Sequence, residues 1–117
     1  MRRLSILLVV AVTGLALAAN ASPMSTKKLV GTVGPGFTIT LKKGKTKVTS
    51  LKAGKYKIVI KDLSNIHNFH LTGPGLNKKT SVGAKGTFNW TVTLKKGTYK
   101  YICDPHASIM KGSFKVT

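Results

Sequence analysis

Apolar and polar residues alternate with a period of two through residues 29–117, and no segment after residue 22 has the 3.6-residue period of an amphipathic helix. Turns rich in glycine and proline, such as Gly34-Pro35-Gly36, separate the alternating segments at points where the backbone needs a positive or fixed φ. Strands are predicted at 29–33, 37–41, 47–51, 56–61, 67–71, 87–94, 99–103 and 112–116. Seven to eight short strands in one domain indicate an all-β fold, a two-sheet sandwich with Greek-key connections.

The chain begins with the pattern of a secretory signal. Two arginines precede an apolar run over residues 4–19, and Ala19-Asn20-Ala21 supplies the small residues that a signal peptidase recognises. The run is shorter than the ~20 apolar residues that span a bilayer, although a retained membrane anchor is the alternative. We expect residues 1–21 to be a signal peptide, residues 22–28 a linker, and residues 29–117 one exported domain that is periplasmic, secreted or at the cell surface.

Cys103 is the only cysteine of the chain, so the domain cannot form an internal disulfide. Small exported domains often depend on disulfides for stability. A single thiol in an oxidising compartment is reactive unless something occupies it, and an odd cysteine is notable for that reason. The lone cysteine is therefore the first indication of a metal site.

The charge of the chain is strongly one-sided. Of its 20 Lys and Arg residues, only Arg2 and Arg3 are arginines, and Asp62 and Asp104 are the only acids. A basic protein suggests nucleic acid as a partner, but export separates the domain from it, and arginine, which suits bidentate phosphate and base contacts, is absent from the domain. Lysines at turns and alternate strand positions are typical of a solvated face. We expect them to attract anionic cell surfaces or acidic protein partners, and we expect no nucleic acid binding.

The last quarter of the chain brings three metal-binding side chains into one short loop. Cys103 ends a predicted strand, and its parity places it on the same face as Tyr99 and Tyr101, toward the core. His106 follows Cys103 after three positions, and Met110 follows His106 after four. A thiolate, an imidazole and a thioether can therefore converge on one point.

A second histidine is predicted to join them from an upstream strand. His67 has the parity of Phe69 and Leu71, so it is expected to point inward with them. His70 has the opposite parity and shares its face with Asn68. Two imidazoles and a thiolate with a weak axial methionine form the blue-copper arrangement, which carries electrons.

Each of these residues has a simpler interpretation when taken alone. Cys103 and Met110 could fill the core, and His67 could be a hydrogen-bonded buried histidine. Their combination in one exported β-sandwich favours a site for one copper ion per chain. A neighbouring carbonyl could replace Met110 as the axial ligand, and zinc accepts the same types of ligand.

Two segments resemble known copper proteins. H-N-F-H-L at residues 67–71 and Y-K-Y-I-C-D-P-H-A-S-I-M-K-G-S-F at residues 99–114 are similar to the copper-binding segments of small cupredoxins of the plastocyanin, pseudoazurin and amicyanin type. The resemblance covers nearly all of residues 29–117, although only these two segments are specific. It implies that Asn68 ties the first ligand segment to the cysteine loop. It also implies four copper ligands, which are His67, Cys103, His106 and Met110.

The cysteine loop departs from these relatives in two respects. Three residues separate His106 from Met110, whereas plastocyanins usually have four and amicyanins two, so the approach of the methionine to copper is left open. Asp104 replaces the hydroxyl residue that is common after the cysteine. A carboxylate beside the site is expected to favour Cu(II).

These features predict a type 1 (blue) copper protein that carries single electrons between redox protein partners outside the cytoplasm, as a monomer and without enzymatic activity. Its electron is expected to leave through the exposed edge of His106. Transient carriers use small interfaces, and an apolar docking patch is expected at Ile66, Pro105, Ala107 and Ile109. The alternatives are an extracytoplasmic copper storage or delivery protein and a metal-free adhesive sandwich that binds anionic polymers. The Met-rich or His-rich motifs typical of storage and delivery are absent from the sequence.

Overall fold

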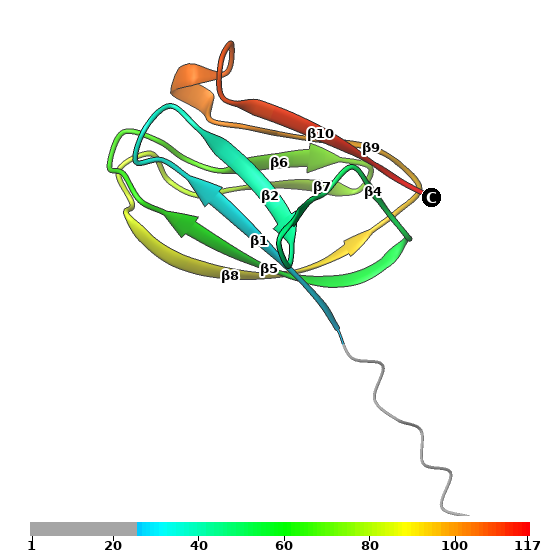
Figure 1. The fold of residues 1–117 in the computed structure, drawn as a ribbon. Coiled ribbons are helices and arrows are strands. Elements are labelled where there is room, and N and C mark those ends of the chain that lie inside the picture. The colour runs from blue at the N-terminus through cyan, green and yellow to red at the C-terminus, as the bar shows by residue number, and fades with distance from the viewer. Residues whose placement is uncertain (1–25) are drawn as a thin grey trace, which may run out of the picture.

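A computed structural model describes residues 26–117 of the chain, and the predicted signal peptide lies outside these residues. The described part contains ten strands, no α-helix and one short 3-10 turn, η1 (Asp104–His106). Its strands form two five-stranded sheets that pack face to face (Figure 1). No helix within residues 26–117 has the length and apolar character needed to cross a membrane. The predicted all-β Greek-key sandwich is confirmed.

The first sheet has the strand order β3-β2-β1-β5-β8. Its central pair, β1 and β5, is parallel, and all its other neighbours are antiparallel. The strands of this sheet are β1 (Lys27–Val33), β2 (Ile39–Lys43), β3 (Thr46–Lys47), β5 (Gly54–Asp62) and β8 (Gly86–Leu94). The long strands β5 and β8 pair over their whole length, which makes them a rigid base for the loops at their ends.

The second sheet has the order β4-β10-β9-β6-β7 and carries the cysteine loop between β9 and β10. Only the edge pair β10 and β4 is parallel. Its strands are β4 (Ser50–Leu51), β10 (Lys111–Val116), β9 (Gly97–Ile102), β6 (His70–Gly73) and β7 (Leu76–Lys79). Figure 1 shows η1 and the loop between β1 and β2 at the same end of the sandwich, away from the C-terminus.

The core lies between the two sheets and follows the predicted alternation. Tyr99, Tyr101 and Cys103 are all buried, as their shared parity predicts. Phe69 stacks on Tyr101 with the ring centroids 5.5 Å apart and the planes inclined by 9°. Aromatic pairs of this kind add packing energy beyond that of the buried area. The aromatic layer therefore links β9 directly to the segment that carries His67.

Ten strands replace the predicted seven to eight, for two reasons. The predicted strand at 47–51 is divided into β3 and β4, because the chain leaves the first sheet and enters the second between them. Strand β7, which lies outside all the predicted strands, pairs with β6. Neither change shows in the hydrophobic pattern, since the three strands β3, β4 and β7 are short and mostly exposed.

The segment around His67 differs from its predicted strand. β6 begins only at His70, and residues 67–69 form an irregular connection in which three consecutive residues are buried. The predicted inward direction of His67 is correct, and Asn68, which strand parity assigns to the opposite face, is also buried, with only 1% exposed. Both sides of this connection are covered by other parts of the chain, so strand parity does not apply to it.

Candidate metal centre

Two imidazoles and one thiol meet at the loop end of the sandwich. The Nδ1 atoms of His67 and His106 are 3.0 Å apart, and the Cys103 sulfur is 3.6 Å from each of them. His67 and Cys103 are fully buried, whereas His106 is partly exposed. The structure therefore brings together the three strongest donors among the residues predicted to form the site.

The spacing of these three donors fits a metal ion. A point equidistant from the two nitrogens and the sulfur lies about 2.0 Å from each, which is close to the 2.0–2.3 Å bonds that first-row metals form with imidazole and thiolate. Both histidines present the same ring nitrogen, so neither ring must turn to reach this point. The chemistry of the set, one soft thiolate with two imidazoles, suits copper.

Backbone hydrogen bonds close the cysteine loop on itself. The Cys103 N–H donates to the Met110 carbonyl at 3.0 Å, and the Met110 N–H donates to the His106 carbonyl at 2.8 Å. Pro105 occupies the first turn of η1, where its fixed φ favours the tight turn and its missing N–H costs nothing. The Met110 side chain is fully buried beneath this loop. The loop thus holds Cys103 and His106 in fixed positions and turns Met110 inward.

Glycines allow the chain to pass close to the site. Gly34 has a φ of +75°, and a Cβ atom there would lie 3.2 Å from the His67 ring and 3.1 Å from Ser64. At Gly112, just after the loop, a Cβ atom would overlap the ring of Tyr101. A side chain at either position would push the ligand segments apart, so both positions favour glycine.

The Cys103 sulfur receives a hydrogen bond from the backbone. The Asn68 N–H lies 3.4 Å from this sulfur, and both groups are buried. Hydrogen bonding around the cysteine sulfur is one of the factors that tune the potential of blue-copper sites. The residue next to His67 therefore acts directly on the sulfur that completes the site.

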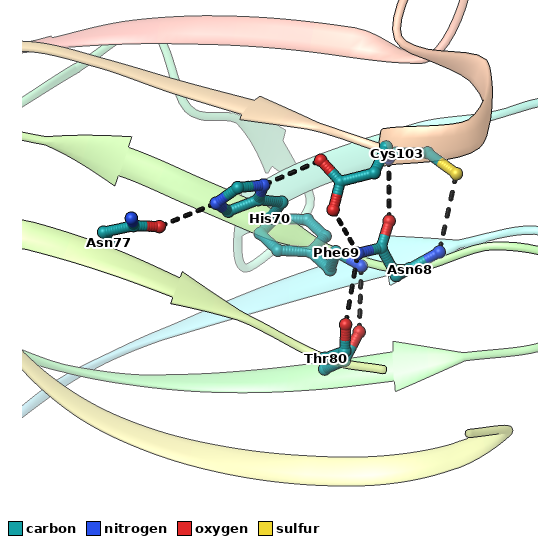
Figure 2. Close-up of polar contacts among 7 residues, drawn as sticks. Asn68, Phe69, His70, Asn77, Thr80 and Cys103 are labelled. Carbon is teal, nitrogen blue, oxygen red and sulfur yellow. Dashed lines mark hydrogen bonds and ion pairs between the residues drawn. The ribbon is translucent and has the colours of Figure 1, made fainter. Parts of the chain in front are cut away.

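The side chain of Asn68 joins the two ligand segments (Figure 2). Its Oδ1 accepts the Asp104 N–H at 2.8 Å, and its Nδ2 donates to Asp104 Oδ2 at 2.7 Å. The same Nδ2 also donates to the Thr80 carbonyl at 3.1 Å. Every polar atom of this buried amide has a partner, as a buried polar group requires. Asn68 thus fixes the distance between the His67 segment and the cysteine loop.

A family model described as copper binding proteins of the plastocyanin/azurin family matches residues 37–117. The chain belongs to this family. The family is described by copper binding, and one thiolate with two imidazoles suits this ion, so copper is the cofactor of the site.

Solved structures share the fold of this copper protein. Reduced rusticyanin is 21% identical, with 80% of this chain and 81% of that chain covered and a TM-score of 0.59. Reduced auracyanin from Roseiflexus castenholzii is 16% identical, with 79% and 98% covered and a TM-score of 0.56. A chain of a heme-copper terminal oxidase dimer is 17% identical, with 77% and 63% covered and a TM-score of 0.54. No curated protein sequence matches significantly. At these identities the matches show the fold.

Two carboxylates flank the metal centre of this family member. Burial alone would raise the pKa of Asp104, but hydrogen bonds from His70 and Asn68 and the charges of His70 and Lys79 outweigh it, so the pKa lies below its ordinary value of 3.8. Burial raises the pKa of Asp62, against the opposing effects of a hydrogen bond from the Ser64 N–H and of the nearby His67. Asp104 is therefore a stable anion beside the site, whereas Asp62 pays a desolvation cost for its charge.

Two buried atoms near the centre have no hydrogen-bond partner among residues 26–117. They are Oδ2 of Asp62 and Nε2 of His67. When Nδ1 of an imidazole binds a metal, Nε2 carries the proton and is a donor. The unpaired carboxylate oxygen of Asp62 is an acceptor, so the two groups are a complementary donor and acceptor.

Phe37 is a site residue that the sequence did not reveal. Its ring packs edge-on against both histidines, with centroid distances of 5.5 Å to His67 and 4.9 Å to His106. The side chain is 56% exposed and lies in the loop between β1 and β2. Phe37 falls within the strand predicted at 37–41, and its position after a Gly-Pro-Gly turn is the only signal of a loop residue. Phe37 covers both imidazoles from the solvent side.

The residues of the predicted docking patch are exposed around the site. Ile66 precedes His67 and is 49% exposed, and Ile109 is 63% exposed, with its N–H donating to the His106 carbonyl at 3.1 Å. Pro105 and Ala107 flank His106 and are also exposed. Phe37 adds to this apolar surface an aromatic ring that the predicted patch lacks.

Proposed function

We propose that this chain is an extracytoplasmic type 1 copper protein that carries one electron at a time between redox protein partners. The proposed ligands are His67, Cys103 and His106, with Met110 as a weak axial ligand. The observation that supports it most is the triangle of two Nδ1 atoms and one sulfur around a point about 2.0 Å from each. Met110 is buried in the same loop, and this position supports it as the fourth ligand.

When bound, copper supplies a Cu(I)/Cu(II) couple at this point. The protein's own part is to keep the donors still, because a donor set that moves little between the two oxidation states keeps the barrier to electron transfer low. The backbone hydrogen bonds of the cysteine loop and the contacts of Asn68 provide this rigidity. The buried His67 and Cys103 exclude water, and the partly exposed His106 offers the shortest route to a partner.

We assign partner binding to two surface features. The exposed apolar side chains around His106, including Phe37, Ile66 and Ile109, form a small and short-lived contact. The lysine-rich surface of the domain attracts an acidic partner over a longer range and speeds the encounter. The protein works as a monomer, is exported by its N-terminal signal, and has no catalytic activity of its own.

The test is to add Cu(II) to the purified metal-free protein of residues 22–117 and to record its visible spectrum and voltammogram. An intense charge-transfer band from thiolate to Cu(II), together with a reversible one-electron wave, supports the carrier. The matched variant Cys103→Ser should lose the band but keep the fold, because serine has nearly the same size. Tight, colourless Cu(I) that passes to an acceptor without redox cycling would instead indicate copper delivery, and a preference for zinc without a copper band would refute the proposal.

A further inference from the structure

His70 is not a member of the proposed ligand set, yet both of its ring nitrogens are engaged. Nδ1 lies 2.7 Å from Oδ1 of Asp104, and Nε2 lies 2.7 Å from Oδ1 of Asn77 (Figure 2). A carboxylate can only accept, so Nδ1 carries the hydrogen of the first bond. The ring is thus fixed between β7 and the cysteine loop.

A continuous chain of hydrogen bonds runs from this ring to the Cys103 sulfur. Asp104 uses Oδ1 for His70 and Oδ2 for Nδ2 of Asn68, at 2.7 Å each. Asn68 in turn places its backbone N–H 3.4 Å from the sulfur. The chain of bonds crosses three times between residues 68–70 and residues 103–104, two segments that are far apart in sequence.

From this arrangement we infer that His70 is a positioning residue of the metal centre, which acts through Asp104 and Asn68 to hold the Asn68 N–H against the Cys103 sulfur. The inference rests on the proposed function, because it concerns the sulfur that is a proposed copper ligand. It adds a residue that touches neither the sulfur nor the imidazoles. In other metal centres, residues that hydrogen-bond to the metal ligands orient these ligands in the same way.

The geometry of Asp104 explains why His70 is needed. The side chain of Asp104 is about one third exposed, at 36%, so one of its oxygens can turn toward water when its partner is removed. Asn68 would then keep Nδ2 bonded to Thr80 alone, and the cysteine loop would be held less firmly. A weaker N–H···S bond leaves more charge on the sulfur, and this favours Cu(II).

The electrostatic effect of losing His70 has the same sign. The Asp104 carboxylate lies next to Cys103 in sequence, and the hydrogen bond from His70 withdraws part of its negative charge from the site. Removing the ring leaves this charge uncompensated and again stabilises Cu(II). Both effects lower the reduction potential, so they cannot cancel. A plain surface ion pair contributes little to stability and would leave the centre unchanged.

The two ring nitrogens allow a test with matched variants. In His70→Asn the amide nitrogen takes the place of Nδ1 and can donate to Asp104, whereas in His70→Gln it takes the place of Nε2 and reaches only Asn77. His70→Ala removes both bonds. The backbone hydrogen exchange of Asn68 is measured by NMR in the metal-free protein, and the reduction potential is measured in the copper protein, all at one pH.

In His70→Ala and His70→Gln we expect the exchange of the Asn68 amide to rise by about tenfold, since a local restraint is lost, and the potential to fall. His70→Asn should restore both values toward the wild type. In an Asp104→Ala background, His70→Ala should have no further effect, because the link to Asn68 is already broken.

The inference is overturned if His70→Ala leaves the Asn68 exchange unchanged, or if His70→Gln and His70→Asn behave alike. The exchange measurement needs no copper, so it separates this inference from the proposed function. A wild-type protein without a blue band refutes the electron carrier, whereas unchanged exchange in a blue protein refutes only the role of His70.

Discussion

Replacing Phe37 by alanine should both destabilise the fold and open the metal centre to water. The side chain is 56% exposed, so a little under half of it is covered, and its ring packs against the two imidazoles. For a phenylalanine of about 200 Å² this is about 90 Å², which at about 25 cal/mol per Å² corresponds to about 2 kcal/mol of unfolding free energy. In a domain of this size, the melting temperature should fall by about 10 °C.

The variant Phe37→Leu is the matched control, because it keeps an apolar cover but lacks the aromatic edge. It should lose less than half of that free energy, about 1 kcal/mol or less. Unfolding of the metal-free protein in urea is followed by the fluorescence of Trp90, which is buried at 7% exposure. In the copper form, Phe37→Ala should lower the reduction potential, since water at the site favours Cu(II). A loss below about 0.5 kcal/mol with an unchanged potential would refute the view of Phe37 as a cover.

Three further outcomes are expected. Met110→Leu should keep the blue band and raise the potential, because the axial ligand tunes it; if voltammetry and spectrum are both unchanged, Met110 is not the axial ligand. Burial raises the pKa of Asp62 in the folded protein above 3.8, so between 3.8 and this raised value the native state binds more protons than the unfolded chain does. The stability of the metal-free protein should therefore fall as pH rises from 3.8 through the raised value, and urea titrations should show that Asp62→Asn removes this fall. The rate of electron transfer with an acidic partner should drop steeply with salt in stopped-flow experiments; a rate that is independent of salt would contradict attraction by the lysines.

The sheets and the three central donors could be predicted because their signals are local. Alternation along β9 determines the direction of Cys103, and the short spacing to His106 keeps the second donor within the same loop. The inward direction of His67 was predicted correctly from strand parity, although the segment is not a strand. Its burial instead comes from packing, with Gly34 against the His67 ring.

What could not be predicted depends on contacts between distant segments. Phe37 reaches the imidazoles only because the loop between β1 and β2 lies at the same end as η1 (Figure 1). The bond between His70 and Asp104 joins residues 34 positions apart, and nothing in the spacing of either residue indicates it. The change of sheet between β3 and β4 is likewise set by packing of the two layers, since two-residue strands have no measurable period.

The hydrogen bond from the Cys103 N–H to the Met110 carbonyl closes the cysteine loop at its base. Directly beyond it, Ile102 pairs with Lys111 in the regular register of β9 and β10. Insertions or deletions between Cys103 and Met110 would leave the sandwich in place and alter only the loop that holds His106. The scaffold can therefore stay constant during evolution while the metal centre varies. Changes of loop length alone can give related chains new reduction potentials.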